Sequence, residues 1–228
     1  MIGCVPTLHV LRVFVNEDGE WGNRLGVFLD GTEIAAADRQ AVAADLGYSE
    51  TVFVDNRPAG WLRIHTPEVE LPFAGHPTVG AAWLLAETGA PVETLRPPAG
   101  EIRGRREGDL AYIVASARFA PEFEYRRLET PAEVGALAGP GADGANLYAW
   151  AWIDQAAGTI RARSFVPEEG IAEDEATGSA ALALCSLLDR PLVVHQGHGS
   201  VIRCRPRAGG KAEVGGRVVL DEVLDYRH

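Results

Sequence analysis

Hydrophobic and polar positions follow the same order of elements twice along the chain. Apolar and polar side chains alternate over residues 61–66, which predicts a half-buried strand, and after a loop an apolar run over 78–88 predicts a helix. A strand over 159–166 and a helix over 177–188 repeat this order. Both helices are apolar on most faces, and helices of that kind lie inside a core. The repeat predicts two similar domains related by a pseudo-twofold axis.

The rest of the chain is rich in short strands. Strands are predicted over 8–15, 23–31, 48–54, 110–115, 147–153, 193–197, 201–204 and 214–220, and a helix over 36–46. We expect an α+β fold in which each domain is a curved sheet or barrel wrapped around a central helix. Residues 90–145 show one good strand only, at 110–115, which places the crossover between the domains near 113–125. The predicted domains are 1–115 and 116–228, and the C-terminal residues can pack back on the first domain.

Composition and charge narrow the class of protein. The chain has 228 residues, 46% of them hydrophobic and 23% charged, and its formal net charge is −11. Its arginines are interrupted by acidic residues, so we expect no nucleic-acid partner. Residues 1–15 lack the features of a signal peptide, and no apolar run reaches the ~18 residues that a membrane span needs. We expect a cytoplasmic protein with no membrane partner.

The cysteines and the known cofactor motifs indicate no metal or cofactor site. Cys4, Cys185 and Cys204 lie at wide spacings and form no CxxC pair, so neither a disulfide framework nor a zinc site is expected. The sequence contains no phosphate-binding glycine loop, dinucleotide fingerprint, nucleophile elbow or zinc-protease motif. We therefore expect no metal and no cofactor.

Two polar motifs stand at the starts of the two apolar helices: Gly75-His76-Pro77-Thr78 and Glu173-Asp174-Glu175-Ala176-Thr177-Gly178-Ser179. A helix start has N–H groups without intrahelical partners and the positive end of the helix dipole, so it suits a carboxylate or a developing enolate. Two such starts predict one ligand held from both sides. Structural alternatives stay open, with His76 as a capping or core histidine and Asp174 and Ser179 as helix caps.

In order and spacing, these motifs resemble the phenazine-biosynthesis PhzF-like family. The resemblance rests on Gly22-Asn23, Tyr48-Ser49-Glu50-Thr51-Val52-Phe53, Leu71 to Ala82 and Glu173 to Ala180, and it covers essentially the whole chain. It implies the diaminopimelate epimerase-like fold, a site in the cleft between the domains, a small-molecule carboxylate substrate and a homodimer. The chain departs from the family pattern at Arg24 and Glu175, where Pro is usual, and over 197–202, which lacks Arg-Pro-Ser.

The resemblance also implies roles for individual residues. Glu50 matches the glutamate that shuttles a proton between carbons of trans-2,3-dihydro-3-hydroxyanthranilate, although from the residues alone it could be a solvated side chain. His76 would bind polar groups of the substrate or assist the transfer, Asp174 would orient an amine or the His76 ring, and Ser179 would bind the carboxylate. The expected catalytic residues are Glu50, His76 and Asp174, and the expected substrate-binding residues are Gly75, His76, Asp174, Gly178 and Ser179.

The expected function is cofactor-independent proton transfer between carbons of a small carboxylate, such as a cyclic acid like dihydro-hydroxyanthranilate, with one glutamate as acid and base. An epimerase mechanism with two thiols is not expected, because neither helix start holds a cysteine. The alternative is a non-catalytic protein that keeps the same cleft to bind a ligand or a partner.

Overall fold

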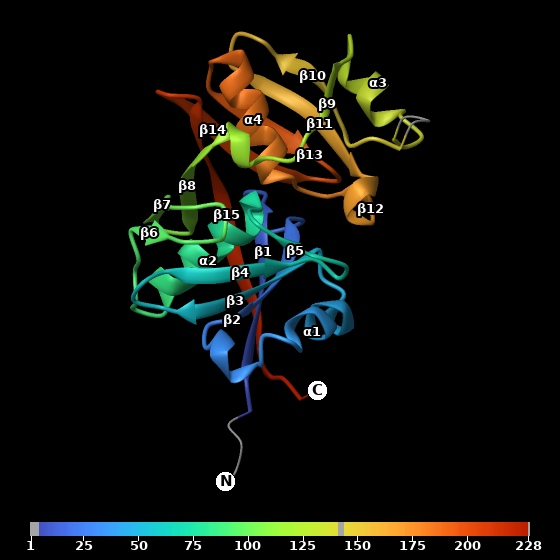
Figure 1. The fold of residues 1–228 in the computed structure, drawn as a ribbon. Coiled ribbons are helices and arrows are strands. Elements are labelled where there is room, and N and C mark those ends of the chain that lie inside the picture. The colour runs from blue at the N-terminus through green and yellow to red at the C-terminus, as the bar shows by residue number, and fades with distance from the viewer. Residues whose placement is uncertain (1–4, 141–143, 228) are drawn as a thin grey trace.

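The computed structural model describes residues 5–140 and 144–227, which form two lobes (Figure 1). The lower lobe in Figure 1 holds the first part of the chain, and the upper lobe holds β9 (Glu124–Arg127) and the strands that follow it up to β14 (Ser200–Arg207). The long strand β15 (Lys211–Asp225) runs from the upper lobe into the lower one. It pairs with β14 at one end and with β1 (Thr7–Val15) at the other.

The remaining strands are short. They are β2 (Asn23–Phe28), β3 (Glu50–Asn56), β4 (Trp61–His65), β5 (Glu70–Leu71), β6 (Thr94–Leu95), β7 (Ile102–Glu107), β8 (Leu110–Ser116), β10 (Leu147–Asp154), β11 (Thr159–Val166), β12 (Ile171–Asp174) and β13 (Leu192–Gln196). The helices are α1 (Arg39–Leu46), α2 (Gly75–Glu87), α3 (Pro131–Gly135) and α4 (Gly178–Leu188), with 3-10 turns η1 (Gly31–Glu33), η2 (Ala117–Phe119) and η3 (Pro167–Glu169).

The described strands belong to one continuous sheet. Its main order is β5-β4-β3-β2-β1-β15-β14-β13-β11-β10-β9, with β12 beside β11 and the group β6, β7 and β8 attached to β15 through β8. Three neighbouring pairs are parallel: β2 with β3, β9 with β10, and β11 with β13. A parallel pair needs a crossover connection. The connections between these strands contain helices α1, α3 and α4, respectively.

Helices α2 and α4 are the centres of the two lobes. Every residue of α2 from Gly75 to Leu85 is buried, and α4 is buried from Gly178 to Leu182. Pro77 is tolerated in the first turn of α2, where its missing N–H would have no intrahelical partner. The order strand, short strand, central helix, hairpin occurs in both halves, as β4-β5-α2 before β7-β8 and as β11-β12-α4 before β13-β14. The predicted α+β fold with two similar halves is confirmed.

The expectation of one strand in residues 90–145 was wrong. The structure places β6, β7 and β9 there beside the expected β8, together with α3. Strand β7 escaped prediction because four of its six residues are charged and only Ile102 is buried, so it has no apolar stripe. The C-terminal strand does pack on the first lobe through β1. The division of domains at residues 115 and 116 stays a prediction.

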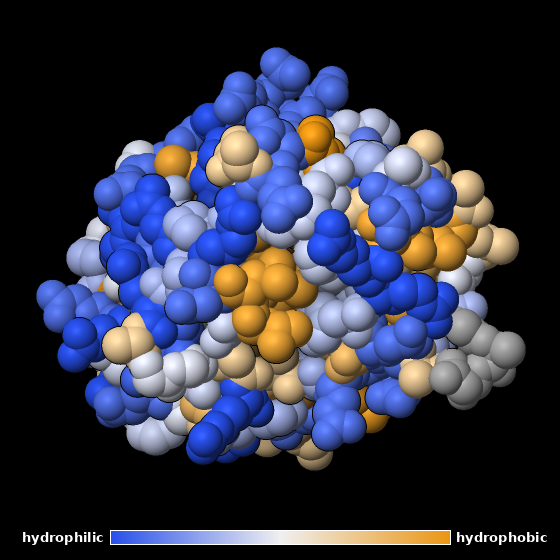
Figure 2. Space-filling model, turned by 90° about the horizontal axis from the view of Figure 1, so that it is seen from above, coloured by the Kyte–Doolittle hydropathy of each residue, from blue (hydrophilic) through white to orange (hydrophobic). Residues whose placement is uncertain are grey.

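The top of the upper lobe is mostly hydrophilic. Figure 2 shows this face with compact hydrophobic patches separated by hydrophilic residues. Small apolar areas of this kind are ordinary on a folded surface. Among the described residues, no helix has the length and apolar composition that crossing a membrane would require.

Candidate active site

The first turns of the two central helices touch each other. A Cβ atom added to Gly75 would lie 2.6 Å from the carbonyl carbon of Gly178 and 2.6 Å from the backbone nitrogen of Ser179. Two backbones can approach this closely only where a residue without a side chain stands between them. The glycines of the two polar motifs therefore allow the two helix starts to meet.

A cavity of about 20 Å³ lies where the two helix starts meet. The six residues expected to form the site all line it: Glu50, Gly75, His76, Asp174, Gly178 and Ser179. Leu71, Phe73, Pro121 and Phe123 supply apolar walls. A volume of this size holds about one water molecule. The structure thus brings residues from both halves of the sequence into one small, largely enclosed space.

Glu50 and His76 form the closest pair of titratable groups in this cavity. Glu50 is the first residue of β3, and its Oε2 atom lies 3.1 Å from His76 Nε2. Both side chains are buried, with 7% and 3% of their surfaces exposed. Burial lowers the pKa of His76 to about 3, against an opposing effect of a hydrogen bond from the ring to the Arg24 backbone. The contact therefore joins a carboxyl group to a neutral ring at pH 7, and it is not an ion pair.

In the neutral ring of His76, one nitrogen is a hydrogen-bond donor and the other is an acceptor. A neutral imidazole carries one N–H, and the His76 ring donates a hydrogen bond to the carbonyl of Arg24. Nε2, which faces Glu50, is then an acceptor. Glu50 Oε2 lies 3.1 Å from this nitrogen, and the two atoms form no hydrogen bond in this geometry. The bond to backbone is a feature of the structural alternative for His76, and the nearness of Glu50 is a feature of the functional one, so the role of His76 stays a prediction.

Asp174 lies at the end of β12 and is held by both halves of the chain. Asn23 Nδ2 donates to its Oδ1 atom over 2.5 Å, and the Thr177 hydroxyl donates to its Oδ2 atom over 2.6 Å. The Asn23 carbonyl in turn accepts a bond of 2.7 Å from the hydroxyl of Ser49, the neighbour of Glu50. Gln196 donates to the backbone carbonyl of Asp174 and to the Thr177 hydroxyl. This network fixes Asp174 relative to β3.

Two opposing effects act on the pKa of Asp174. Burial raises the pKa, whereas hydrogen bonds from Thr177, Asn23 and the backbone N–H of Ala176 lower it, and the balance is a raised pKa. Asp174 accepts hydrogen bonds from the backbone N–H of Ala176 and from the hydroxyl of Thr177. Both residues precede α4, so Asp174 does not cap the N–H groups of the helix itself, as the helix-cap alternative required. Among the described residues, neither Ala74 before α2 nor Thr177 before α4 makes a side-chain capping bond.

Glu175, one of the departures from the family pattern, holds a hairpin beside the site. Its carboxylate accepts hydrogen bonds from the backbone N–H groups of His198 and Gly199 and from the Ser200 hydroxyl. The Ser200 oxygen accepts a bond of 3.0 Å from the backbone N–H of Gly22 in the other lobe. A chain of contacts therefore runs from Glu175 to the residue that precedes Asn23.

Several residues in this network were not expected from the sequence. Asn23 was noticed only as part of a motif, and Gln196, Tyr148 and Thr177 were not assigned to the site. Tyr148 donates to Gln196 over 3.0 Å, and both side chains are fully buried. A lone buried glutamine or asparagine gives no periodic signal, so a position in the motif was the only clue available for Asn23 and Thr177.

The cysteines stand apart from the site. Cys185 and Cys204 are buried in the core formed by α4 and the surrounding strands, and Cys4 lies outside the described residues. In the part of the chain that the structure describes, no three or more His, Cys, Asp or Glu side chains gather closely enough to hold a metal ion.

A family model described as phenazine biosynthesis-like protein matches residues 12–137, more than half of the chain. The chain belongs to this family. The matched segment includes Asn23, Glu50 and the first helix start, whereas Asp174 and the second helix start lie beyond it. The family identified from the motifs is thus confirmed.

Relatives of this family align over different shares of the chain. An uncharacterized isomerase from Mesorhizobium japonicum is 40% identical over 126 residues, which span 50% of this chain and 39% of that protein. The alignment with an uncharacterized isomerase from Pasteurella multocida spans 28% of the relative. The trans-2,3-dihydro-3-hydroxyanthranilate isomerase of Pseudomonas aeruginosa is 28% identical, and that alignment covers 82% of this chain and 78% of the enzyme.

Solved structures match the fold over nearly the full length. A phenazine biosynthesis PhzC/PhzF protein from Clostridium difficile has a TM-score of 0.78 at 20% identity and covers 98% of this chain and 100% of its own. A predicted epimerase from Pseudomonas aeruginosa has a TM-score of 0.74 at 25% identity and covers 97% of this chain and 99% of its own. The family fold therefore includes both lobes and the junction between them.

Proposed function

We propose that this protein is an isomerase that moves a proton between two carbons of a small carboxylate, with Glu50 as the acid and base. The observation that carries the proposal is the pair of Glu50 and His76, 3.1 Å apart and buried where two helix starts meet. A group that takes and returns a proton must reach the substrate in a water-poor space. Relatives that are named isomerases support the reaction class.

In the proposed reaction Glu50 takes a proton from one carbon and returns it to a second carbon conjugated with the first. The electron pair of the broken C–H bond spreads into an enolate of the substrate. Once Glu50 carries the proton, it can donate a hydrogen bond to His76 Nε2, which accepts because the ring is neutral. His76 thus stabilises the protonated state of Glu50, and no cofactor enters the step.

The backbone N–H groups at Gly75, His76, Gly178 and Ser179 are the proposed holders of the substrate carboxylate and of the enolate. These residues line the cavity, and the positive ends of both helix dipoles lie beside it. Both carboxylate oxygens of Asp174 already accept hydrogen bonds, so we propose that Asp174 orients the site and does not carry the proton.

The small volume of the cavity sets a condition on substrate entry. Its volume of about 20 Å³ is far below the ~300 Å³ of the smaller ligand sites. The apolar wall, which includes Phe73 and Phe123, must therefore move before a cyclic acid can enter. Closure behind the substrate would then exclude water from the enolate.

Deuterium exchange tests the proposal. Incubation with trans-2,3-dihydro-3-hydroxyanthranilate, the substrate in the name of one relative, or with related small acids in D₂O should place deuterium at a C–H position detectable by NMR. Glu50→Gln should abolish this exchange. Glu70→Gln is the matched control, because Glu70 is an exposed carboxylate paired with Arg63 outside the cavity. Exchange that survives in Glu50→Gln would remove Glu50 as the base, and binding without exchange would indicate a non-catalytic binding protein.

A further inference from the structure

One face of the sheet in this acidic chain is basic. Directly paired residues in neighbouring antiparallel strands point to the same face of a sheet. Strand pairing places Arg203, Gly215 and Tyr112 in one row across β14, β15 and β8. Rows on this face carry a third of the chain's 21 lysines and arginines, namely Arg103, Arg105, Arg203, Arg205, Arg207, Lys211 and Arg217.

This basic face lies on the side of the sheet opposite the central helices. The alternate residues of the same strands, such as Ile113, Ile202 and Val214, are fully buried in the core with α2 and α4. Because side chains alternate between the two faces, Tyr112 and the arginines point outward. The face therefore belongs to a different part of the surface from the candidate active site.

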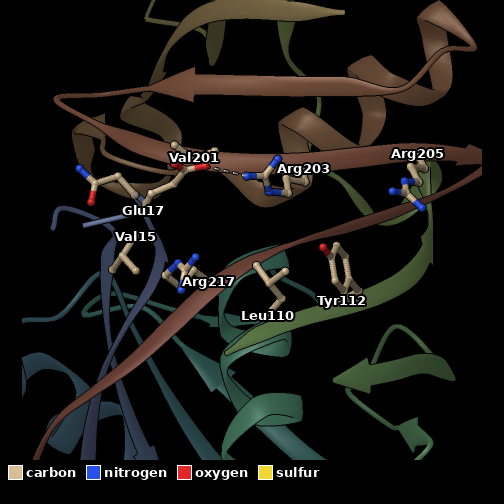
Figure 3. A pocket seen from close by; sticks show the side chains of 9 residues that line it. Val15, Glu17, Leu110, Tyr112, Val201, Arg203, Arg205 and Arg217 are labelled. Atoms are coloured by element: carbon tan, nitrogen blue, oxygen red, sulfur yellow. Dashed lines mark ion pairs between the residues drawn. The ribbon is translucent and has the colours of Figure 1, made fainter. Parts of the chain in front are cut away.

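A cavity of about 270 Å³ opens on this face (Figure 3). Arg203 and Arg205 from β14, Arg217 from β15 and Tyr112 from β8 line it. The remaining lining residues are the apolar Val15, Leu110 and Val201 and the polar Asn16 and Glu17. It shares no lining residue with the cavity at the helix starts. Gly215 lets the Tyr112 ring lie over the sheet, since a Cβ there would come within 2.3 Å of the ring.

Nearby acidic groups leave part of this positive charge unmatched. Glu213 is buried and binds Arg105 and Arg207, and Asp109 pairs with Arg217. Arg203 has only a distant contact of 3.8 Å to Glu17, whose side chain is 83% exposed. Arg205 faces Glu213 across β14 and β15, but among the described residues the carboxylate of Glu213 forms its ion pairs with Arg105 and Arg207 and not with Arg205.

The Tyr112 hydroxyl adds a second kind of donor to the cavity. The ring lines the cavity together with Arg203 and Arg205, and the Arg105 guanidinium lies 4.1 Å from the centre of the ring. Arginines gathered on a concave surface repel one another unless an anion neutralises them. The lining of the cavity thus combines three arginines and one glutamate with a tyrosine hydroxyl and apolar walls.

We propose that this cavity binds a small anion that carries two or more carboxylate or phosphate groups. Guanidinium groups bind the planar edges of carboxylate and phosphate through paired hydrogen bonds, and the tyrosine hydroxyl can donate one more. The volume suits an anion of the size of pyrophosphate or citrate and is too small for most larger cofactors. Contact of this face with the same face of a second copy would bring the two basic surfaces together, so self-association here is disfavoured.

Calorimetric titration with pyrophosphate and with citrate, at low ionic strength, tests the proposal. The wild-type chain should bind at least one of these anions, and acetate, with a single carboxylate, should bind at least about tenfold more weakly. Arg205→Gln should weaken binding about tenfold, since it removes a charged hydrogen-bond donor, and Arg203→Gln/Arg205→Gln should weaken it further. Binding of pyrophosphate alone would identify a phosphate ligand, and binding of citrate alone a polycarboxylate.

Arg127→Gln is the matched control, because Arg127 is an exposed arginine on β9 and its loss changes the net charge equally. If anions were attracted to surface arginines in general, Arg127→Gln and Arg205→Gln would weaken binding equally. That result would overturn the proposal. Absence of measurable binding by either anion would overturn it too. So would a dimer that dissociates in Arg205→Gln, because the face would then be a subunit interface. These measurements need no isomerase activity and so stand apart from the proposed function.

Discussion

The low pKa of His76 in the folded protein should make the protein less stable as the pH falls from 7 to 5. The folded pKa of His76 is about 3, whereas an unfolded chain has the ordinary value of 6.5. Between these values the unfolded chain binds a proton that the folded protein excludes. A group whose pKa is lowered on folding in this way favours the unfolded state as the pH falls below 6.5. The loss from His76 at pH 5 is about 2 kcal/mol relative to pH 7.

Urea unfolding of the wild type and of His76→Gln at pH 7, 6 and 5 measures this effect. Burial also lowers the pKa of His9, His65 and His195, which therefore contribute to the pH dependence of both proteins. Their contribution cancels when the two pH dependences are subtracted. The difference that remains should be about 2 kcal/mol at pH 5, with the wild type more sensitive to acid. His195→Gln is the matched control and should keep most of the wild-type slope.

The opposite sign would refute the reasoning about the pair. If His76 were an imidazolium held by a Glu50 carboxylate, its folded pKa would be raised, and its stabilising effect would be largest below pH 6.5 and lost at higher pH. Acidification from pH 7 to pH 5 would then stabilise the wild type relative to His76→Gln. Equal slopes would mean that the ring reaches solvent in the folded state.

Three further substitutions test other parts of the site and its surroundings. Gly75→Ala should lower the free energy of unfolding in urea by about 1–3 kcal/mol and abolish deuterium exchange into the substrate, because its Cβ would collide with the second helix start. In Gly178→Ala the added Cβ meets its nearest atom at 3.0 Å, so this substitution should cost less. Glu175→Gln should speed hydrogen exchange at the amides of residues 198–199 about tenfold by mass spectrometry, since these N–H groups lose charged acceptors, and unchanged exchange would contradict that role. Burial raises the pKa of Glu213 and the guanidinium groups of Arg105 and Arg207 lower it, with a lowered pKa overall. Glu213→Gln should therefore lose about 1–2 kcal/mol at pH 7, and its difference from the wild type should shrink as the pH falls below 4.5, the ordinary value of the unfolded chain, and through the lowered pKa of the folded protein.

The sequence contains the parts of the candidate site whose signal is local. Gly75, His76 and Gly178 stand at the starts of apolar helices, and Glu50 begins a strand after a helix, so pattern and turn chemistry can find their positions. The contact between Gly75 and Gly178 depends on how two lobes meet, which no periodicity encodes. The bond from Asn23 to Asp174 joins residues 151 positions apart. Long-range polar pairs of this kind become visible only when the fold is known.

The two departures from the family pattern show why such differences need not change the chemistry. Arg24 contributes its backbone carbonyl to His76, and any residue at that position has a carbonyl, while its guanidinium lies 4.9 Å from the centre of the Tyr48 ring. At the position of Glu175, a proline would restrict the backbone through its ring. Glu175 restrains the same turn through hydrogen bonds to the hairpin at 198–200. The turn that follows Asp174 is therefore ordered by side-chain hydrogen bonds and not by a proline ring.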